Sequence, residues 1–371
     1  MKTDSFFCRL LVVFMLLSMI LSACSPTADP VVEVQPTVTM EATEPVEETK
    51  ENEPEAPTEE AIDEPIAEEV EATPAPVVLT GLPINDFFEA GYNELLKRNP
   101  EYIVDLGLEE YFPTDELLTD ISPEAEAERA ALQQELLDIL HSYEYASLTP
   151  SEQISYQVME WDMETSLQAY EMRAYDYPVT YFSVRSVPQL AIMFFTDTLQ
   201  VNSLDDAEMY LARLEALGLK IEQAAGLVQE NADAGVIPPV DVLYGARTSI
   251  SNNLGSTAVN SPLYKVFKGH LKELDISDEK NDELLADAKA IINDTVYPAF
   301  DVLDSTLESL LKDAPSKVGL SQYEGGEEYY QFLLKYFTTT SLTPVEIHET
   351  GIVELARIQE EMRQRFAELG Y

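Results

Sequence analysis

A helix-start signal that occurs twice, Thr-Pro-x-Glu, constrains the fold of this chain more than any other feature of its sequence. At Thr149 and again at Thr343, a hydroxyl side chain stands at the capping position, proline follows at the first helical position and glutamate stands at the third. The hydroxyl and the carboxylate can each accept a hydrogen bond from a free backbone N–H group, and proline loses no hydrogen bond there. We therefore predict that a helix begins after each of these threonines.

The segment that follows Thr343 has the pattern of an amphipathic helix. Its charged residues, such as Arg357 and Glu361, occupy one face, and its apolar residues recur every three or four positions on the other. The apolar positions are Ile352, Leu355, Ile358, Met362, Phe366 and Leu369. This stripe predicts that one face of the helix packs against a core.

Similar patterns predict helices in most of the remaining chain. The predicted ranges are 85–97, 124–143, 150–170, a long run from Ser203 to Pro238, 241–254, and 282–311 with a bend at Pro298. Only residues 178–195, which contain several prolines, are expected to be extended, and no sustained alternation of apolar and polar residues predicts a sheet. We expect an all-α, multi-helix, bundle-like domain over residues 81–371.

The first 24 residues have the pattern of an export signal. Lys2 and Arg9 flank a short basic region, residues 10–21 are almost all apolar, and the segment ends in Leu-Ser-Ala before Cys24. That ending resembles a bacterial lipobox, in which the cysteine becomes the lipidated first residue of the mature protein. We predict a signal peptide over residues 1–24, a lipid on Cys24, and an exported protein held at a membrane surface of the bacterial cell envelope. An ordinary cleaved signal and an uncleaved anchor are the alternatives.

Residues 25–80 contain no aromatic side chain and a single basic one, Lys50, among many glutamates and prolines. Such a composition cannot bury enough apolar surface to offset its chain entropy, so the segment is predicted to be a disordered, acidic tether. The whole chain carries a formal net charge of -47. This excess of acidic residues argues against nucleic-acid binding, which requires a clustered basic surface.

The C-terminal part of the chain resembles the bacterial domain-of-unknown-function family eight-eight-five. The matching motifs, in order, are Gly319-Leu320-Ser321, Tyr329-Tyr330, Thr338-Thr339-Thr340, Leu342-Thr343-Pro344 and Glu346-Ile347-His348, and the resemblance extends over about residues 85–371. Members of that family look like zinc metallopeptidases of the gluzincin type, largely helical, with the zinc motif His-Glu-Ala-x-Pro-Gly-His-His well downstream of these segments. The resemblance implies zinc as cofactor and a peptide as substrate.

That zinc motif does not occur in the 371 residues. We therefore expect the chain to be the N-terminal helical part of such a protein, truncated before a missing C-terminal half and inactive alone, with the stripe around Leu355, Met362 and Phe366 exposed. The alternative is a complete, non-enzymatic helical lipoprotein that binds a ligand or partner. A hydrolase of another kind is a third possibility.

The titratable residues point to no catalytic or metal site within the chain. A zinc hydrolase commonly uses two histidines one helical turn apart, but His141, His270 and His348 each lack such a neighbour, and Ile352 stands where the second ligand would follow His348. We therefore expect no bound metal. A substrate groove lined by Tyr323, Tyr329 and Tyr330 is one interpretation of the tyrosine-rich C-terminal region, and packing between helices is the other.

Overall fold

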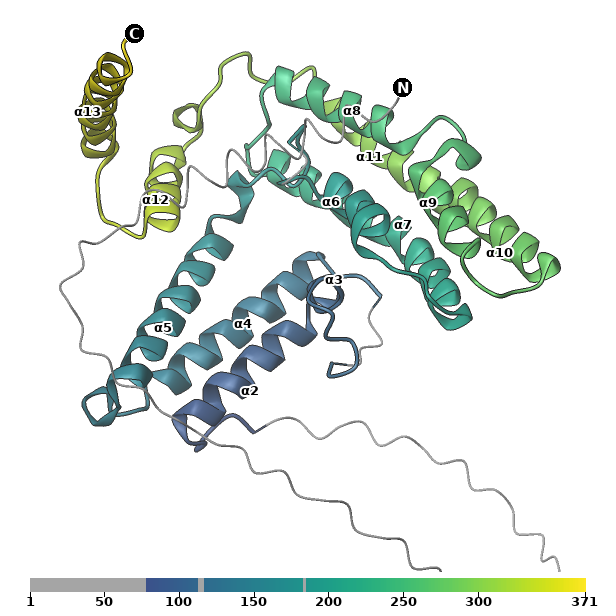
Figure 1. Ribbon diagram of the computed structural model, residues 1–371, viewed down its shortest axis with the longest axis horizontal. Coiled ribbons are helices and arrows are strands. Elements are labelled where there is room, and N and C mark those ends of the chain that lie inside the picture. The colour runs from purple at the N-terminus through teal and green to yellow at the C-terminus, as the bar shows by residue number, and fades with distance from the viewer. Residues whose placement is uncertain (1–77, 113–116, 183–184) are drawn as a thin grey trace, which may run out of the picture. The chain divides into compact units, whose positions relative to one another are not determined.

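The computed structural model describes residues 78–112, 117–182 and 185–371, and all regular structure in these residues is helical (Figure 1). This confirms the predicted all-α fold. The predicted signal peptide with Cys24 and nearly all of the predicted tether lie outside the described residues. In the part of the chain that the structure describes, no helix combines the length and the apolar character that a membrane crossing requires.

Three longer helices and one short helix form the N-terminal part of the fold. They are α2 (Ile84–Lys97), α3 (Pro100–Asp105), α4 (Pro123–Leu140) and α5 (Pro150–Glu171). Helices α2, α4 and α5 lie side by side around a small core that includes Phe87, Leu136, Leu140 and Met163 (Figure 1). The predicted capping box at Thr149 is present, since its hydroxyl accepts from the Glu152 N–H and the Glu152 carboxylate accepts from the Thr149 N–H.

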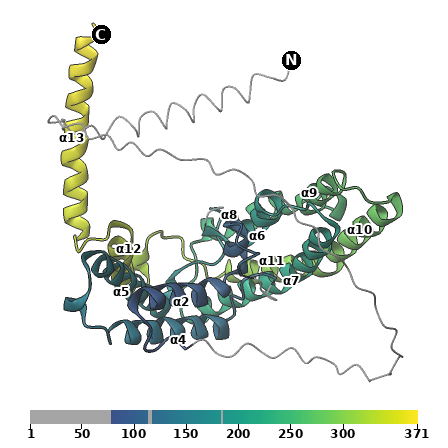
Figure 2. The same ribbon diagram turned by 60° about the horizontal axis from the view of Figure 1, so that its bottom comes forward.

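The larger core is organised around α7 (Leu204–Asp233), the longest helix of the described residues. Tyr210, Leu214, Leu217 and Ile221 on α7 are fully buried in this core. The surrounding helices are α6 (Val187–Met193), α8 (Val240–Leu254), α9 (Pro262–Leu271), α10 (Asp278–Ile291) and α11 (Tyr297–Leu310). Figure 2 shows α7 and α11 running alongside each other.

A glycine lets α7 approach its neighbour closely. A Cβ built on Gly218 would lie 2.5 Å from Cγ2 of Thr295, in the π-helical segment Ile292–Val296. A larger residue at Gly218 would therefore require the side chain of Thr295, or the segment that carries it, to move.

Two predicted helix boundaries differ from the observed ones. Helix α7 ends at Asp233 rather than at Pro238, because Gly235 has φ of 87° and the N–H groups of Gly235 and Val236 return to the carbonyls of Ala232 and Asn231. The predicted helix over 282–311 begins at Asp278. It widens into the π-helical segment Ile292–Val296 just before Pro298, the residue at which the sequence predicted a bend.

The prediction of an extended segment over residues 178–195 is wrong for its second half. Helix α6 begins at Val187, with Pro188 in its first turn, and the π-helical segment Phe194–Thr198 continues it. Proline is compatible with the first turn of a helix because its missing N–H would have no partner there. Pro188 therefore starts a helix instead of preventing one.

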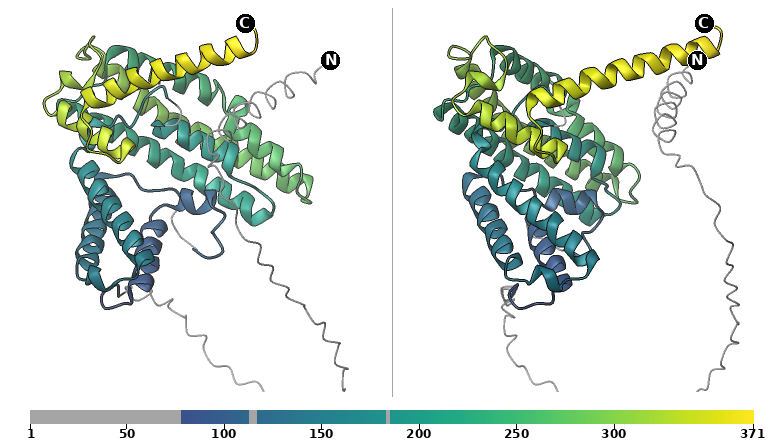
Figure 3. Two further views of the ribbon diagram at one scale, coloured as in Figure 1. Left: turned by 60° about the vertical axis from the view of Figure 1, so that its left-hand side comes forward. Right: turned by 90° about the vertical axis from the view of Figure 1, so that its left-hand side faces the viewer.

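Helices α12 (Gly326–Thr338) and α13 (Pro344–Glu368) complete the described chain. The predicted capping box at Thr343 and Glu346 is present. No residue of α13 is buried, and Leu355, Met362 and Phe366 are each about half exposed, at 52%, 50% and 50%. Figure 3 shows α13 as one long uninterrupted helix. The apolar stripe is therefore exposed in this chain, as predicted, and covers no core among the described residues.

Candidate functional site

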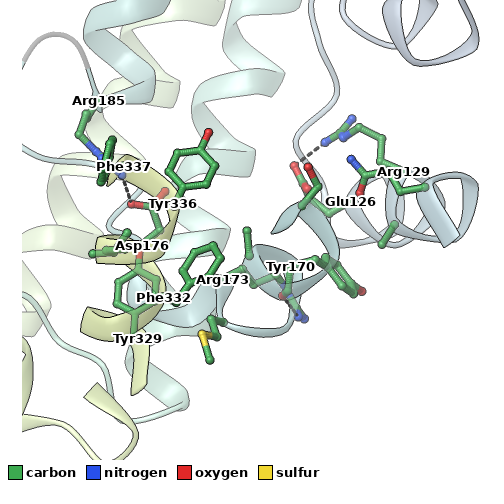
Figure 4. Close-up of a pocket in the computed structure, with 16 residues that line it drawn as sticks. Glu126, Arg129, Tyr170, Arg173, Asp176, Arg185, Tyr329, Phe332, Tyr336 and Phe337 are labelled. Atoms are coloured by element: carbon green, nitrogen blue, oxygen red, sulfur yellow. Dashed lines mark hydrogen bonds and ion pairs between the residues drawn. The ribbon is translucent and has the colours of Figure 1, made fainter. Parts of the chain in front are cut away.

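A cavity of about 620 Å³ lies between α4, the C-terminal end of α5 and α12. Figure 4 shows aromatic side chains of α12 on one side, Glu126 and Arg129 of α4 on the other, and Tyr170 and Arg173 between them. Its volume is within the range of about 300–1,000 Å³ that small-molecule and cofactor sites usually have. This cavity is our candidate functional site.

The aromatic wall of the cavity is one face of α12. Tyr329, Phe332 and Tyr336 recur every three or four residues, so their rings follow each other along the helix, with centroids 6.1 Å and 6.0 Å apart. Outside α12, Tyr175 stacks on Tyr329 at 5.2 Å and Trp161 stacks on Tyr336 at 6.1 Å. The two stacks attach both ends of α12 to the rest of the fold and hold the wall in place.

A tight glycine turn sets the position of α12. Gly325 has φ of 74°, and a Cβ built on Gly326 would lie 1.8 Å from the Leu320 carbonyl oxygen. The hydroxyl of Tyr175 donates a hydrogen bond to the Glu324 carbonyl in the same turn. This turn at the glycine pair determines where Tyr329 enters the cavity wall.

Tyr329 is buried, with 6% of its surface exposed. Burial, and secondarily the nearby carboxylate of Asp176, raises the pKa of Tyr329 to about 12. The phenol is therefore neutral at physiological pH and presents an uncharged aromatic surface with a hydroxyl group.

Replacing Tyr329 by phenylalanine should change how stability depends on alkaline pH. A folded-state pKa raised above the unfolded value gives a stabilising contribution that is complete below pH 10 and is lost as pH rises toward 12. The stability advantage of the wild-type chain over Tyr329→Phe is therefore expected to shrink between pH 10 and 12. Urea unfolding at a series of pH values measures it, with Tyr330→Phe as the control on the neighbouring exposed residue. A difference that stays constant across this range would contradict the prediction.

The three tyrosines predicted to line one groove occupy different positions. Tyr329 lines the candidate cavity, whereas Tyr330 is exposed and lines a second cavity of about 430 Å³ beside Pro344. Tyr323 donates a hydrogen bond to the Ile237 carbonyl at 2.6 Å and pairs with the hydroxyl of Tyr177 at 2.8 Å. Burial raises the pKa of both Tyr177 and Tyr323. Of the three, only Tyr329 therefore contributes to the candidate cavity.

Three arginines line the cavity, each held by an acidic neighbour. Arg129 pairs with Glu126, which belongs to the same helix. Arg185 donates to Asp176 at 2.9 Å. Arg173 donates to Glu230 at 3.3 Å, and its guanidinium lies 4.5 Å from the centre of the Tyr170 ring. Sequence reasoning missed these arginines because they are 44 and 12 residues apart along the chain and share no motif.

The described residues do not fit a zinc site. His141 lies 2.9 Å from Glu160, while His270 is on α9 and His348 is on the exposed helix α13. Within residues 78–112, 117–182 and 185–371, no group of three or more histidine, cysteine, aspartate or glutamate side chains is arranged to hold a metal ion. The charged groups of the cavity are arginines and carboxylates, which suit the binding of a charged organic ligand.

The fold has a counterpart among solved structures. The crystal structure described as that of "the putative lipoprotein from Colwellia psychrerythraea" matches with a TM-score of 0.69 and 20% sequence identity. The match covers 78% of this chain and 51% of that chain, so the present chain spans about half the length of this neighbour. No curated protein sequence matches the chain.

A family match covers most of the helical domain. The family described as "Bacterial protein of unknown function (DUF885)" matches residues 100–371, from the start of α3 to the end of α13 and beyond. This range includes every element that lines the candidate cavity. The chain belongs to this bacterial family of unknown function.

Proposed function

We propose that this chain is the N-terminal helical part of a zinc metallopeptidase-like protein of the bacterial cell envelope, and that its helices support a metal centre whose ligands lie outside these 371 residues. The exposed apolar stripe of α13 is the observation that carries this proposal. The gluzincin character comes from the family resemblance, and the neighbour's length allows for a further part of similar size.

The stripe on α13 has the spacing of a helix that packs lengthwise along another element. Gly351, Leu355, Ile358 and Met362 follow each other at intervals of four, three and four residues. A Cβ built on Gly351 meets nothing within 4 Å, so the described chain makes no use of this glycine. Glycine inside a helix lowers helix stability by about 1 kcal/mol relative to alanine. A close contact with a second helix, which a side chain would prevent, explains a glycine at this position. We assign this face to contact with the missing C-terminal half of the protein.

The same proposal includes a lipid on Cys24 that anchors the protein at the cell envelope. A lipid on Cys24 would hold the protein to a membrane surface through buried hydrocarbon, worth about 0.8 kcal/mol per methylene group. The solved neighbour, whose description includes the word lipoprotein, supports this assignment. Peptides reaching the envelope would then be the substrates of the complete protein.

The experiment combines metal content, peptide hydrolysis and dye binding of the purified chain. We expect less than one zinc per chain, no hydrolysis, and strong binding of a hydrophobic dye. Changing Leu355, Ile358 and Met362 together to glutamine should remove most of the dye signal. The matched control changes three apolar residues on other helices to glutamine and should leave most of the dye signal. These residues are Ile154, Val158 and Leu219, which are 63%, 63% and 61% exposed. One tightly held zinc per chain, or an absence of dye binding, would contradict the proposal.

A complete, non-enzymatic helical lipoprotein is the second candidate function, and the cavity beside α12 favours it. The natural gene discriminates between the two. An in-frame His-Glu-Ala-x-Pro-Gly-His-His motif after codon 371 would support the peptidase proposal, whereas a stop codon at that point would support the binding protein.

A further inference from the structure

We infer that the cavity between α4, α5 and α12 binds the C-terminal carboxylate of a peptide whose last residue is aromatic. This inference goes beyond the proposed function because it requires neither zinc nor a second part of the protein. It rests on the charges of the cavity, the hydrogen-bond donors that remain free there, and the aromatic wall.

The charge of the cavity differs from that of the molecule. The chain carries 69 acidic and 22 basic residues, yet three arginines and only two acidic residues line the cavity. The arginines are Arg129, Arg173 and Arg185, and the acidic residues are Glu126 and Asp176. Each arginine is paired with one carboxylate, so the cavity is close to neutral and repels an anion less than the remaining acidic surface does.

The arginines keep donors for a ligand. A guanidinium has five N–H donors, and Arg173 uses one nitrogen on the Tyr170 carbonyl at 3.1 Å and another on Glu230 at 3.3 Å. Arg185 has a hydrogen bond from one nitrogen to Asp176. The side chains of Arg173 and Arg185 are 42% and 48% exposed, so both remain accessible. Their acidic partners orient the two guanidinium groups without using all of their donors, which leaves donors for a carboxylate.

The aromatic wall of the cavity determines which side chain of the ligand fits. Tyr329, Phe332 and Tyr336 offer aromatic surfaces, and the ring of Phe337, 65% exposed, stands against Tyr336 at 5.2 Å. An aromatic side chain of a ligand can stack on these rings while its carboxylate lies at the arginines.

The two acidic residues distinguish a peptide from a nucleotide, which also combines an aromatic ring with an anion. Glu126 and Asp176 would repel the two negative charges of a nucleoside monophosphate. A peptide end carries one negative charge, and its backbone N–H groups can donate to these carboxylates. The mixture of arginines and carboxylates in one cavity therefore favours a peptide.

The chain provides its own reporter for the test. Trp161 is the single tryptophan and stacks on Tyr336, which lines the cavity. Titration with N-acetyl-Gly-Phe, whose carboxylate is free, should change the tryptophan fluorescence. The C-terminal amide of the same dipeptide lacks the charge and should bind at least about tenfold more weakly.

Arg173→Gln and Arg185→Gln should each weaken binding of the free acid at least about tenfold while barely changing the affinity for the amide. Arg363→Gln is the matched control, since Arg363 pairs with Glu360 at 2.9 Å on α13, outside the cavity. Circular dichroism verifies that each variant is folded, and Arg173→Lys provides a second, milder change at the same position.

Three outcomes would overturn the inference: no binding of either dipeptide, equal binding of acid and amide, or tighter binding of adenosine monophosphate than of the acid. None of them involves zinc content or dye binding, so a failure here is distinguishable from a failure of the proposed function.

Discussion

Gly326→Ala is expected to lower the free energy of unfolding by about 3 kcal/mol, at the upper end of the usual cost of overpacking. The added methyl group would lie 1.8 Å from the Leu320 carbonyl oxygen and 2.7 Å from its carbonyl carbon. Because the obstacle is backbone, no side-chain rotation can relieve the overlap, and the turn before α12 must move. Urea unfolding of the variant and the wild-type chain measures the difference.

The matched control is Gly226→Ala, at an exposed position in the interior of α7. A Cβ built there meets nothing within 4 Å. The same substitution should therefore stabilise the chain, by up to about 1 kcal/mol, because alanine is the better helix former. If both variants changed stability in the same direction, the overlap at Gly326 would not be the cause.

Gly326→Ala should also affect the candidate cavity. The turn at Gly326 positions α12, and α12 supplies the aromatic wall with Tyr329, Phe332 and Tyr336. Moving the first turn of this helix shifts all three rings relative to Arg173, which also lines the cavity. We expect weaker binding of N-acetyl-Gly-Phe in any Gly326→Ala protein that remains folded.

Helix starts were the most predictable part of this fold. At Thr149, Ser203 and Thr343 the cap is a local hydrogen bond between side chain and backbone three residues ahead, so its residues stand together in the sequence. The buried positions of α7 were predictable for a similar reason, since a single helix periodicity places Leu214 and Ile221 on one face.

Segments whose conformation depends on tertiary packing were not predictable in this way. Helices α3 and α9 are short, at 6 and 10 residues, and were not predicted. Isolated helices of this length are marginal in water, so packing against the core decides whether they form. The segment that contains Phe194 and Phe195 was predicted to be extended, but it is helical and both rings are buried in the core.

The candidate cavity was predicted only at Tyr329. Its aromatic wall belongs to one helix, and the tyrosines near residue 329 drew attention to that region. Its arginines come from α4, from the residues after α5 and from the segment before α6, and only the tertiary fold brings them to one place. The positions of these arginines along the chain give no indication that they lie near one cavity in the fold.

Glu101→Gln is expected to lower the free energy of unfolding by about 3 kcal/mol, because it leaves a buried ammonium group without its counter-ion. Lys220, 8% exposed in the middle of α7, donates to both carboxylate oxygens of Glu101 at 2.7 Å and 2.6 Å. Its remaining hydrogen bond is to the Thr119 carbonyl at 3.3 Å. This cluster joins α3, the segment before α4, and α7. Thermal and urea unfolding of the variant measure the loss.

Lys220→Met tests whether charge or packing explains this loss. It removes the buried charge, and the carboxylate of Glu101 keeps its hydrogen bond from the Thr119 N–H at 2.9 Å. Lys220→Met should therefore cost less than Glu101→Gln, and adding Lys220→Met to Glu101→Gln should restore part of the lost stability. Glu283→Gln, which removes one of the two acidic partners of the half-buried Lys280, should leave the unfolding midpoint unchanged.

The pH dependence gives an independent test of the same mechanism. Burial lowers the pKa of Lys220, although the charge of Glu101 partly opposes the shift. A lysine whose folded-state pKa lies below the unfolded value of about 10.4 binds fewer protons when folded, so stability rises with pH as the folded group loses its proton. Without Glu101 this pKa falls further, so the deficit of Glu101→Gln should shrink as pH rises toward 10, below the range where Tyr329 ionises. A deficit independent of pH would mean that lost packing, and not an uncompensated ammonium group, destabilises the variant.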